Sequence, residues 1–186
     1  MNPGFSKRRQ AGFTMVELIT VIILMGILGA IGASRFFDDT AFENRAYADQ
    51  AKAIIRYAQK LAVTENRFIF VRTDGNSFAI CATLACGGGS LVNAPGGSNS
   101  GSRATRANCL QAGVYRAAWM CEGRPASVNV NGLPGNAIYF DALGRPYNGT
   151  DAIGNPSTFV AAQVIRFTSG ANASQITIWP ETGYVQ

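Results

Sequence analysis

The stretch KRRQAGFTMVELITVIILMGILGAIGA, residues 7–33, decides the fold. Three cations at positions 7–9 precede residues 13–33, in which Glu17 is the only ionisable side chain. An α-helix rises 1.5 Å per residue, so these 21 residues would span about 32 Å, close to the thickness of the hydrocarbon core of a bilayer. The stretch therefore predicts a membrane-spanning helix whose N-terminus lies in the cytoplasm, on the side of the basic cluster.

A secretory signal peptide is the alternative interpretation of this segment. Such a peptide has a shorter apolar region, which is followed by a cleavage site of small residues. Here the apolar run is long and continues into a helical pattern without interruption, because no proline occurs between Pro3 and Pro95. The sequence therefore favours a helix that is retained over a signal peptide that is removed.

The helical pattern continues beyond the apolar run. Apolar residues recur at spacings of three and four, which is typical of one helical face. They are Phe37, Ala41, Tyr47, Ala48, Ala51, Ile54, Ile55, Ala58, Leu61 and Ala62, and the opposite face carries Asp38, Asp39, Glu43, Arg45, Asp49, Lys52, Arg56 and Lys60. We expect one continuous helix from about residue 13 to about residue 65, about 80 Å long, whose amphipathic half covers a globular domain.

The composition excludes several classes of catalytic site. The chain of 186 residues has no histidine, which excludes Ser-His-Asp and Cys-His arrangements and most catalytic zinc sites. Its net charge is +5, but without residues 1–12 the remaining 13 basic and 11 acidic residues leave only +2. A carboxylate pair of Asp141 and Glu181 and a calcium loop at Asp151 are weaker candidates, since all three stand beside turn residues. We expect no enzymatic activity, no cofactor and no metal.

Four cysteines, Cys81, Cys86, Cys109 and Cys121, follow the helical region. An even number of cysteines in a glycine-rich, exported region predicts two disulfides in an oxidising compartment. The alternative is a metal site of four thiolates, but the spacing contains no C-x2-C pair. The sequence leaves all three possible pairings open.

After Arg67 the pattern changes to a period of two, which predicts strands. A hairpin is expected in residues 67–83 around Asp74-Gly75-Asn76, and a glycine-rich surface loop is expected at residues 84–108. Further strands are expected at residues 112–121 and 126–132, and residues 136–148 are expected to form a strand that ends in a turn around Leu143-Gly144-Arg145-Pro146. A final hairpin at residues 161–186 has a last strand that ends the chain. The predicted fold class is α+β, with a long N-terminal helix packed on an antiparallel sheet.

The residues at the start of the apolar run, Gly12-Phe13-Thr14-Met15-Val16-Glu17-Leu18-Ile19, resemble the N-terminus of type IV pilins and pseudopilins. The resemblance rests on a basic leader, a glycine directly before a phenylalanine, and a glutamate four residues further on. It implies that a prepilin peptidase removes the leader, residues 1–12, by cleaving between Gly12 and Phe13, and that it methylates the new N-terminus at Phe13. The mature chain would then have a transmembrane and filament-core helix at 13–34, an amphipathic half at 35–66, and a β-rich head at 67–186.

This resemblance gives Glu17 a physical role. An unpaired carboxylate inside a membrane is unfavourable by about 2.5–3.5 kcal/mol. Cleavage after Gly12 would create a positive α-amino group at Phe13. In a filament whose helices form a common core, Glu17 of one subunit would neutralise Phe13 of the next and so fix the register of assembly. The alternative is a tolerated glutamate near the end of an ordinary single-span anchor.

Two stretches of the head resemble the minor pseudopilin H and FimT-like branch of this family, IYFDALGRP at residues 138–146 and ITIWPETGYV at residues 176–185. With the N-terminus and the cysteines, they resemble a minor pilin of the mannose-sensitive haemagglutinin (MSHA) type. The resemblance implies a structural subunit of a pilus, with a role in initiation, at the tip or in adhesion. It would reside in the bacterial inner membrane with a cytoplasmic N-terminus and a periplasmic head before it enters the filament. Its partners would be other pilin subunits, the prepilin peptidase and the inner-membrane assembly platform.

Two alternatives remain for the function. One is a minor subunit of a type II secretion pseudopilus, which would differ in its partners. The other is DNA binding, since FimT-like minor pilins of uptake machines bind DNA. The candidate phosphate contacts are Arg103, Arg106, Arg116 and Arg124, in or near the glycine-rich loop. The small mature charge speaks against DNA, and a solvated or ion-paired loop is the other interpretation of these arginines.

Overall fold

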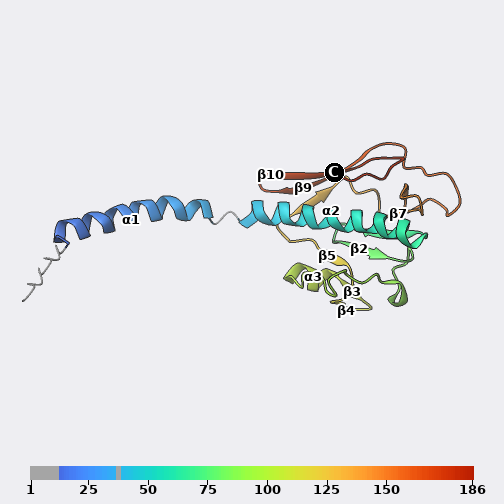
Figure 1. The fold of residues 1–186 in the computed structure, drawn as a ribbon, viewed down its shortest axis with the longest axis horizontal. Helices are drawn as coiled ribbons and strands as arrows, with labels where there is room; N and C mark the ends of the chain where they lie inside the picture. Colours follow the sequence, from blue (N-terminus) through green and yellow to red (C-terminus); the bar gives the residue numbers. More distant parts are fainter. Residues whose placement is uncertain (1–12, 37–38) are drawn as a thin grey trace, which may run out of the picture. The chain divides into compact units, whose positions relative to one another are not determined.

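Two compact units make up the chain, Met1–Asp39 and Thr40–Gln186. The computed structural model describes residues 13–36 and 39–186, with the side chains of residues 30–40 left out. The first unit contains helix α1 (Met15–Phe36), and the second contains nearly all of helix α2 (Asp39–Glu65) together with the strands (Figure 1). The predicted continuity of the helix through residues 37 and 38 lies outside the described residues.

Helix α2 forms because it buries one face. Its fully buried residues follow the spacing of three and four that the sequence predicts, and burial of such a face supplies most of the stability of a helix in a protein. They are Tyr47, Ala48, Ala51, Ile54, Ile55, Ala58 and Ala62, whereas Glu43, Arg45, Asp49, Arg56 and Lys60 are exposed. Ala41, Lys52 and Leu61 are half-buried, and Phe37, Asp38 and the side chain of Asp39 lie outside the described residues. The prediction of an amphipathic helix over a domain is confirmed for the residues that are described.

The strands form antiparallel sheets. The five-stranded sheet has the order β5–β2–β1–β7–β8, the three-stranded sheet has the order β10–β9–β6, and β3 pairs with β4. The strands are β1 (Ile69–Thr73), β2 (Ser77–Cys81), β3 (Leu110–Gln111), β4 (Val114–Tyr115), β5 (Cys121–Gly123), β6 (Asn129–Asn131), β7 (Ala137–Phe140), β8 (Pro146–Asn148), β9 (Gln163–Ser169) and β10 (Asn172–Ile178). The predicted α+β class, a helix packed on antiparallel strands, is confirmed.

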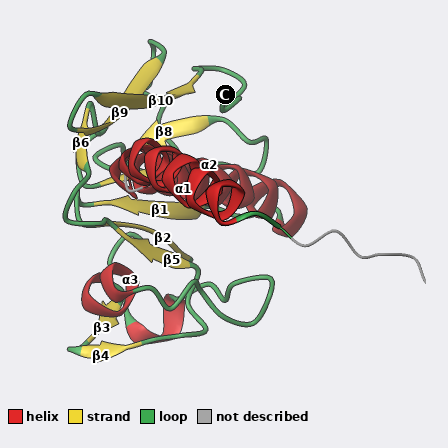
Figure 2. Ribbon diagram, turned by 90° about the vertical axis from the view of Figure 1, so that its left-hand side faces the viewer, coloured by secondary structure: helices red, strands yellow, loops and turns green. Residues whose placement is uncertain are grey.

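One hydrophobic core joins α2 to both larger sheets. The five-stranded sheet contributes alternate residues of β1, β2 and β7, and the three-stranded sheet contributes residues of β9 and β10. Tyr47 of α2 shows this directly, because its ring centroid lies 6.0 Å from that of Phe78 in β2 and 5.7 Å from that of Phe167 in β9. The sequence predicts a single sheet, but the strands of two sheets cover α2 (Figure 2).

The first two strands form the predicted hairpin. In its loop the Oδ1 atom of Asp74 accepts hydrogen bonds from the backbone N–H groups of Asn76, at 3.0 Å, and Ser77, at 2.9 Å. Gly75, which lies between Asp74 and Asn76, has a φ of +82°, a conformation that glycine adopts without strain. Turn chemistry local to three residues therefore sets this hairpin, which is why the sequence reveals it.

The glycine-rich segment 84–108 is more regular than the predicted surface loop. It contains a short 3-10 helix, η1 (Gly88–Ser90), and the helix α3 (Arg103–Asn108). The side chain of Ser102 caps α3 by accepting a hydrogen bond from the backbone N–H of Thr105 at 3.1 Å. The prediction of an irregular loop is therefore wrong for its second half, where a serine cap starts a helix.

The strand predicted at residues 112–121 is interrupted. Strand β4 ends at Tyr115 and β5 begins at Cys121. Between them the backbone N–H of Trp119 donates to the carbonyl of Arg116 at 3.2 Å, and the indole of Trp119 is buried, with only 1% of its surface exposed. Burial of this large side chain favours the turn over a continuous strand.

The end of the chain also differs from the prediction. Strand β10 ends at Ile178, and the chain then turns back so that Val185 bridges to Ile178. The backbone of this returning segment is bound to α2. Arg56 donates from Nε, at 2.9 Å, and Nη2, at 2.6 Å, to the carbonyl of Val185, and Gln59 donates to the carbonyl of Thr182 at 2.7 Å. The predicted final strand is therefore divided into β10 and a returning segment at residues 184–186. Side chains of α2, far away in the sequence, hold this returning segment and the turn before it.

Candidate functional site: the N-terminal segment and its first helix

Helix α1 begins with a side-chain cap. The hydroxyl of Thr14 accepts a hydrogen bond from the backbone N–H of Glu17 at 3.2 Å, and the carbonyl of Thr14 accepts the first bond of the helix, from Leu18, at 3.2 Å. Thr14 is thus the N-cap and Glu17 stands three residues into the helix, the spacing of a capping box. The cap is readable from Thr14-x-x-Glu17, but our sequence analysis did not identify it.

Glu17 lies in the first turn of α1. The N-terminal end of a helix carries a partial positive charge, so a carboxylate in the first turn is favourable there and a cation is not. A new α-amino group at Phe13 would stand about 6 Å away along the helix direction. The Glu17 carboxylate therefore occupies the position from which a negative charge offsets both the helix end and a cationic N-terminus.

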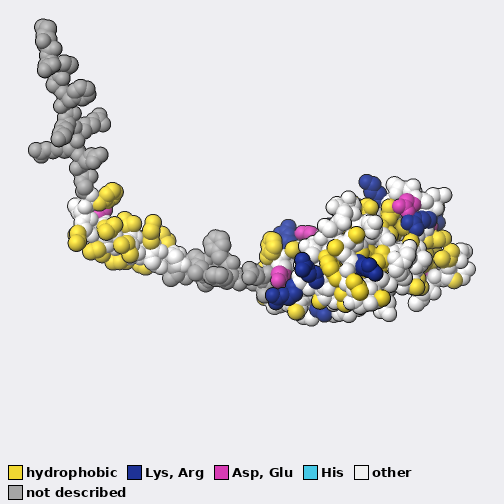
Figure 3. All heavy atoms as spheres, turned by 90° about the horizontal axis from the view of Figure 1, so that it is seen from below, with side chains coloured by type: hydrophobic (Ala, Val, Ile, Leu, Met, Phe, Trp, Pro, Cys, Tyr) yellow, Lys and Arg dark blue, Asp and Glu magenta, His cyan; other side chains and the backbone are white. Residues whose placement is uncertain are grey.

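The apolar side chains of α1 are exposed on every side of the helix. Those described with large exposed fractions are Phe13, Met15, Val16, Leu18, Ile19, Val21, Ile22, Ile23, Leu24, Met25, Ile27 and Leu28, with Phe13 at 83%. Figure 3 shows hydrophobic side chains gathered along this helix. A helix that is apolar all round is normally buried in lipid or in protein. Within the part of the chain that the structure describes, no helix is both long enough and apolar enough to cross a membrane.

The predicted processing site is only partly described. Gly12 lies outside the described residues, whereas Phe13 and Glu17 lie within one turn of the start of α1. Cleavage after Gly12, methylation of Phe13 and the pairing of Phe13 with Glu17 stay predictions.

The cysteines form two disulfides. Cys81 pairs with Cys86, and Cys109 pairs with Cys121. Three of the four residues have no exposed surface, and Cys86 is 9% exposed. With Ala79 and Trp119, they form a second hydrophobic cluster that is separate from the main core. The disulfides therefore fasten residues 82–121 onto strands β2 and β5.

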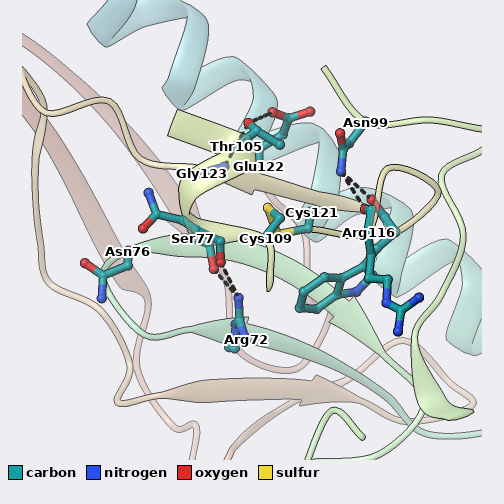
Figure 4. The surroundings of a disulfide bond; sticks show 12 residues. Arg72, Asn76, Ser77, Asn99, Thr105, Cys109, Arg116, Cys121, Glu122 and Gly123 are labelled. Atoms are coloured by element: carbon teal, nitrogen blue, oxygen red, sulfur yellow. Dashed lines mark hydrogen bonds between the residues drawn. A yellow bond between two sulfur atoms is a disulfide. The ribbon is translucent and has the colours of Figure 1, made fainter. Parts of the chain in front are cut away.

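Helix α3 is also fixed to β5 by polar contacts beside the second disulfide (Figure 4). The hydroxyl of Thr105 donates to the Glu122 carboxylate at 2.7 Å and accepts from the backbone N–H of Gly123 at 3.2 Å. A Cβ atom at Gly123 would lie 2.2 Å from the carbonyl oxygen of Ala104. Only a glycine allows α3 to approach β5 this closely.

The candidate arginines lie around α3 and β5. Arg103 and Arg106 are in α3, Arg116 follows β4, and Arg124 follows β5. Arg103 and Arg124 line one groove of about 700 Å³, where Glu43 of α2 adds a carboxylate. The structure therefore brings two of the four into one groove, beside an acidic group that weakens its attraction for phosphate.

Two of these guanidinium groups are bound to backbone carbonyls. Arg106 donates to the carbonyl of Gly101 at 2.9 Å. Arg124 donates to the carbonyl of Gly75 at 2.7 Å and to that of Val128. These bonds hold the turn before α3 and the tip of the first hairpin, so Arg106 and Arg124 have structural roles that the sequence does not reveal.

The carboxylates considered for chemistry serve in turns. Asp141 accepts hydrogen bonds from two backbone N–H groups of the turn that follows β7, and Glu181 is exposed in the last turn of the chain. Burial alone would raise the pKa of the Asp151 carboxyl, but hydrogen bonds from Thr158 and from the backbone of Asn148 outweigh it and hold that pKa below its ordinary value. Among the described residues, no group of three or more Cys, Asp or Glu is placed to hold a metal ion.

Comparison with known proteins gives one match to a sequence motif and two to curated relatives. Residues 7–33 match the prokaryotic N-terminal methylation motif. The chain is 37% identical to the type IV narrow pilus major component PilA5 of Thermus thermophilus, over 37% of this chain and 65% of that protein. It is 33% identical to the type II secretion system core protein G of Aeromonas hydrophila, over 48% of this chain and 54% of that protein. The chain thus spans less than two thirds of the length of either relative.

One solved structure aligns with much of the chain. The crystal structure of the type IV minor pilin FimU of Pseudomonas aeruginosa aligns with 77% of this chain and 87% of its own, with a TM-score of 0.46 and 14% identity. The N-terminal motif and the two curated relatives confirm the resemblance that the sequence predicts. The chain is therefore similar to proteins of type IV pili and of type II secretion systems.

Proposed function

We propose that the chain is a structural subunit of a type IV pilus, and a minor one. A prepilin peptidase cleaves it between Gly12 and Phe13 and methylates Phe13. Before assembly it is a single-pass protein of the bacterial inner membrane, with its leader in the cytoplasm and its head in the periplasm. The inner-membrane assembly platform then transfers it into the filament among other pilin subunits, where it acts in initiation, at the tip or in adhesion.

The exposed apolar surface of α1 carries this proposal. Among the described residues of the first unit, the large apolar side chains from Phe13 to Leu28 are between 42% and 83% exposed. Each 100 Å² of apolar surface removed from water contributes about 2.5 kcal/mol, so the helix is stable only inside lipid or against other apolar helices. A membrane before assembly and a bundle of like helices in a filament provide these two environments in turn.

The position of Glu17 supports the same function. Inside an apolar environment its carboxylate requires a partner, and the α-amino group that cleavage would create at Phe13 is a cation only about one helical turn away. A pair between neighbouring subunits neutralises both charges and allows only one relative position of the two helices.

A subunit of a type II secretion pseudopilus is the second candidate function, because one of the curated relatives is a core protein of that system. The other relative is a major pilus component. The assignment as a minor subunit rests on the resemblance of residues 138–146 and 176–185 to minor subunits. Binding of DNA by Arg103 and its neighbours is a weaker alternative, since Arg106 and Arg124 already bind backbone carbonyls.

Intact mass and N-terminal sequence test the proposal. The chain would be produced in hosts with and without a prepilin peptidase. We expect a peptidase-dependent start at N-methylated Phe13. A retained leader, or cleavage elsewhere, would show that the chain does not enter this pathway.

A pair of variants tests the role of Glu17. Glu17→Gln keeps the shape of the side chain and removes its charge, and Thr20→Ala is the matched control one helical turn away. We expect normal membrane insertion and cleavage for both, with greatly reduced filament incorporation for Glu17→Gln only. Normal incorporation of Glu17→Gln would refute the charge pair while leaving the maturation pathway standing.

A further inference from the structure

We propose that a groove on the outer face of the five-stranded sheet binds a small organic acid that has an apolar body and one carboxylate. The groove has a volume of about 580 Å³, within the range of about 300–1,000 Å³ of ligand pockets. Its floor is the side of β1 and β7 that faces away from α2. Ile69 and Val71 of β1 enter the main core, so Phe70 and Arg72 point to the opposite side, into the groove.

The walls of the groove keep an apolar space open. On one side, Leu84 and Cys86 belong to the short loop that the Cys81–Cys86 disulfide closes, and Leu84 is 53% exposed at the rim. On the other side, Gly149 lies against Ala137, where a Cβ atom would stand 2.6 Å from the carbonyl oxygen of Ala137. Small residues thus leave room above the floor for an apolar group of a ligand.

A fixed guanidinium group stands at one end of this space. Arg72 donates from Nη2 to the hydroxyl of Ser77 at 2.6 Å (Figure 4) and to the carbonyl of Asn108 at 3.4 Å. Its Cζ atom lies 4.8 Å from the ring centroid of Trp119, whose Nε1–H is in turn bound to the carbonyl of Ile80 at 2.8 Å. A guanidinium held on an aromatic face in this way is preorganised for a planar anion.

The hydrogen-bonding groups at this end, and not its net charge, favour an anion over a cation. Asp74 and Arg72 are the charged residues that line the groove. Oδ1 of Asp74 is taken up by the backbone of the hairpin turn, and Oδ2 lies 3.3 Å from Nε of Arg72. No described residue accepts a hydrogen bond from Nη1 of Arg72. On the Arg72–Asp74 pair, the Nη1 donor of Arg72 is therefore open to an acceptor, which a carboxylate supplies.

The site therefore selects for two features at once. A carboxylate alone would gain little, because Asp74 offsets part of the charge of Arg72. An apolar molecule alone would leave Nη1 without a partner. A ligand with a short apolar body lying over Phe70, beside Leu84 and Ala137, and a carboxylate at Nη1 satisfies both.

Methyl NMR of the full chain in detergent micelles tests this assignment, with 4-phenylbutyrate as the probe and 4-phenylbutyramide as its uncharged analogue. We expect saturable shifts of the Leu84 and Ala137 methyl signals with a millimolar dissociation constant. The amide should bind at least ~10-fold more weakly, because it lacks the charge-assisted hydrogen bond.

Three variants make the test specific. Arg72→Gln should abolish the saturable shifts, while Arg103→Gln, which removes the same charge outside the groove, should leave them unchanged. Thr150→Trp at the exposed edge should block the groove without altering the guanidinium, so a loss of binding there supports the site even if Arg72→Gln perturbs the fold.

Several results would overturn the proposal. Equal binding of the acid and the amide would remove the role of Arg72, and shifts confined to the leucines of α1 would show partition into the micelle only. A peptide ending in a free leucine that binds more than ~10-fold tighter than 4-phenylbutyrate would replace the small molecule by the terminus of a protein chain.

Discussion

Loss of the Cys109–Cys121 disulfide should destabilise the chain more than loss of the Cys81–Cys86 disulfide. The two bridges have sequence separations of 12 and 5 residues. A cross-link stabilises a protein mainly by restricting its unfolded chain, and the effect grows with the logarithm of the loop length. This relation gives about 3 kcal/mol for the longer loop and about 2 kcal/mol for the shorter one.

Packing should widen the difference. Cys109 and Cys121 are fully buried beside Trp119, whereas Cys86 lies at the edge of the same cluster. Replacement of two buried sulfurs by hydrogen leaves a cavity, and each removed group of this size adds roughly 1 kcal/mol. The Cys109→Ala/Cys121→Ala variant should therefore lose about 5 kcal/mol of unfolding free energy, the sum of the loop contribution and the two cavity contributions.

The assay is unfolding by urea of the full chain in detergent micelles, followed by tryptophan fluorescence. Trp119 is 1% exposed and Trp179 is 44% exposed, so most of the change in emission on unfolding should come from Trp119 beside the disulfide. The matched variant is Cys81→Ala/Cys86→Ala. If this second variant loses as much stability as the first, the argument from loop length and burial fails. If mass spectrometry finds four free thiols in the wild-type chain, the disulfides themselves are disproved.

Three further perturbations follow from single contacts. Arg56→Met removes both hydrogen bonds to the carbonyl of Val185 and should lower the unfolding free energy by about 1–2 kcal/mol. The control Arg45→Met, on the same helix, should change the unfolding free energy by less than about 0.5 kcal/mol. Equal effects of the two variants in urea unfolding would contradict the contact. Gly183→Ala places a Cβ atom 2.3 Å from a backbone carbonyl at a φ of +61° and should lower the melting temperature by several degrees, so an unchanged melting curve would refute the close approach. Asp151 has a lowered pKa in the folded state, so its contribution to stability is present above its ordinary pKa of 3.8 and is lost as the pH falls through the folded value. The unfolding free energies of wild type and Asp151→Asn should therefore differ at about pH 6 and converge toward about pH 2. A difference that stays constant with pH would exclude this linkage.

The elements that the sequence predicts are those that local chemistry sets. The face of α2 follows from the spacing of its alanines and isoleucines, and the first hairpin follows from Asp74 and its two neighbours. The segment around Phe13 and Glu17 is recognisable as a prokaryotic N-terminal methylation motif because the motif is compact and contiguous. Each of these patterns is complete within one segment of the chain.

The features that the sequence does not predict depend on residues far apart. Helix α3 is capped by its neighbour Ser102, but it is held in place by Glu122, and the returning segment at the chain end is held by Arg56 across 129 positions of sequence. The division into two sheets follows from which strands meet Tyr47, and no periodicity within one strand carries that information. A single sequence shows that such polar side chains exist but does not show which carbonyl or carboxylate each will meet.

The bond from Arg56 to Val185 also covers an unpaired backbone group at the edge of the three-stranded sheet. A strand at the edge of a sheet offers unpaired backbone groups that can recruit another chain, and proteins often block such edges with charge. Residues 184 and 186 form backbone hydrogen bonds with the end of β10. The carbonyl of Val185 between them accepts hydrogen bonds from the guanidinium of Arg56 instead of from another strand. An edge blocked by a cation in this way would keep the β-domains of two copies from joining strand to strand when they stand side by side.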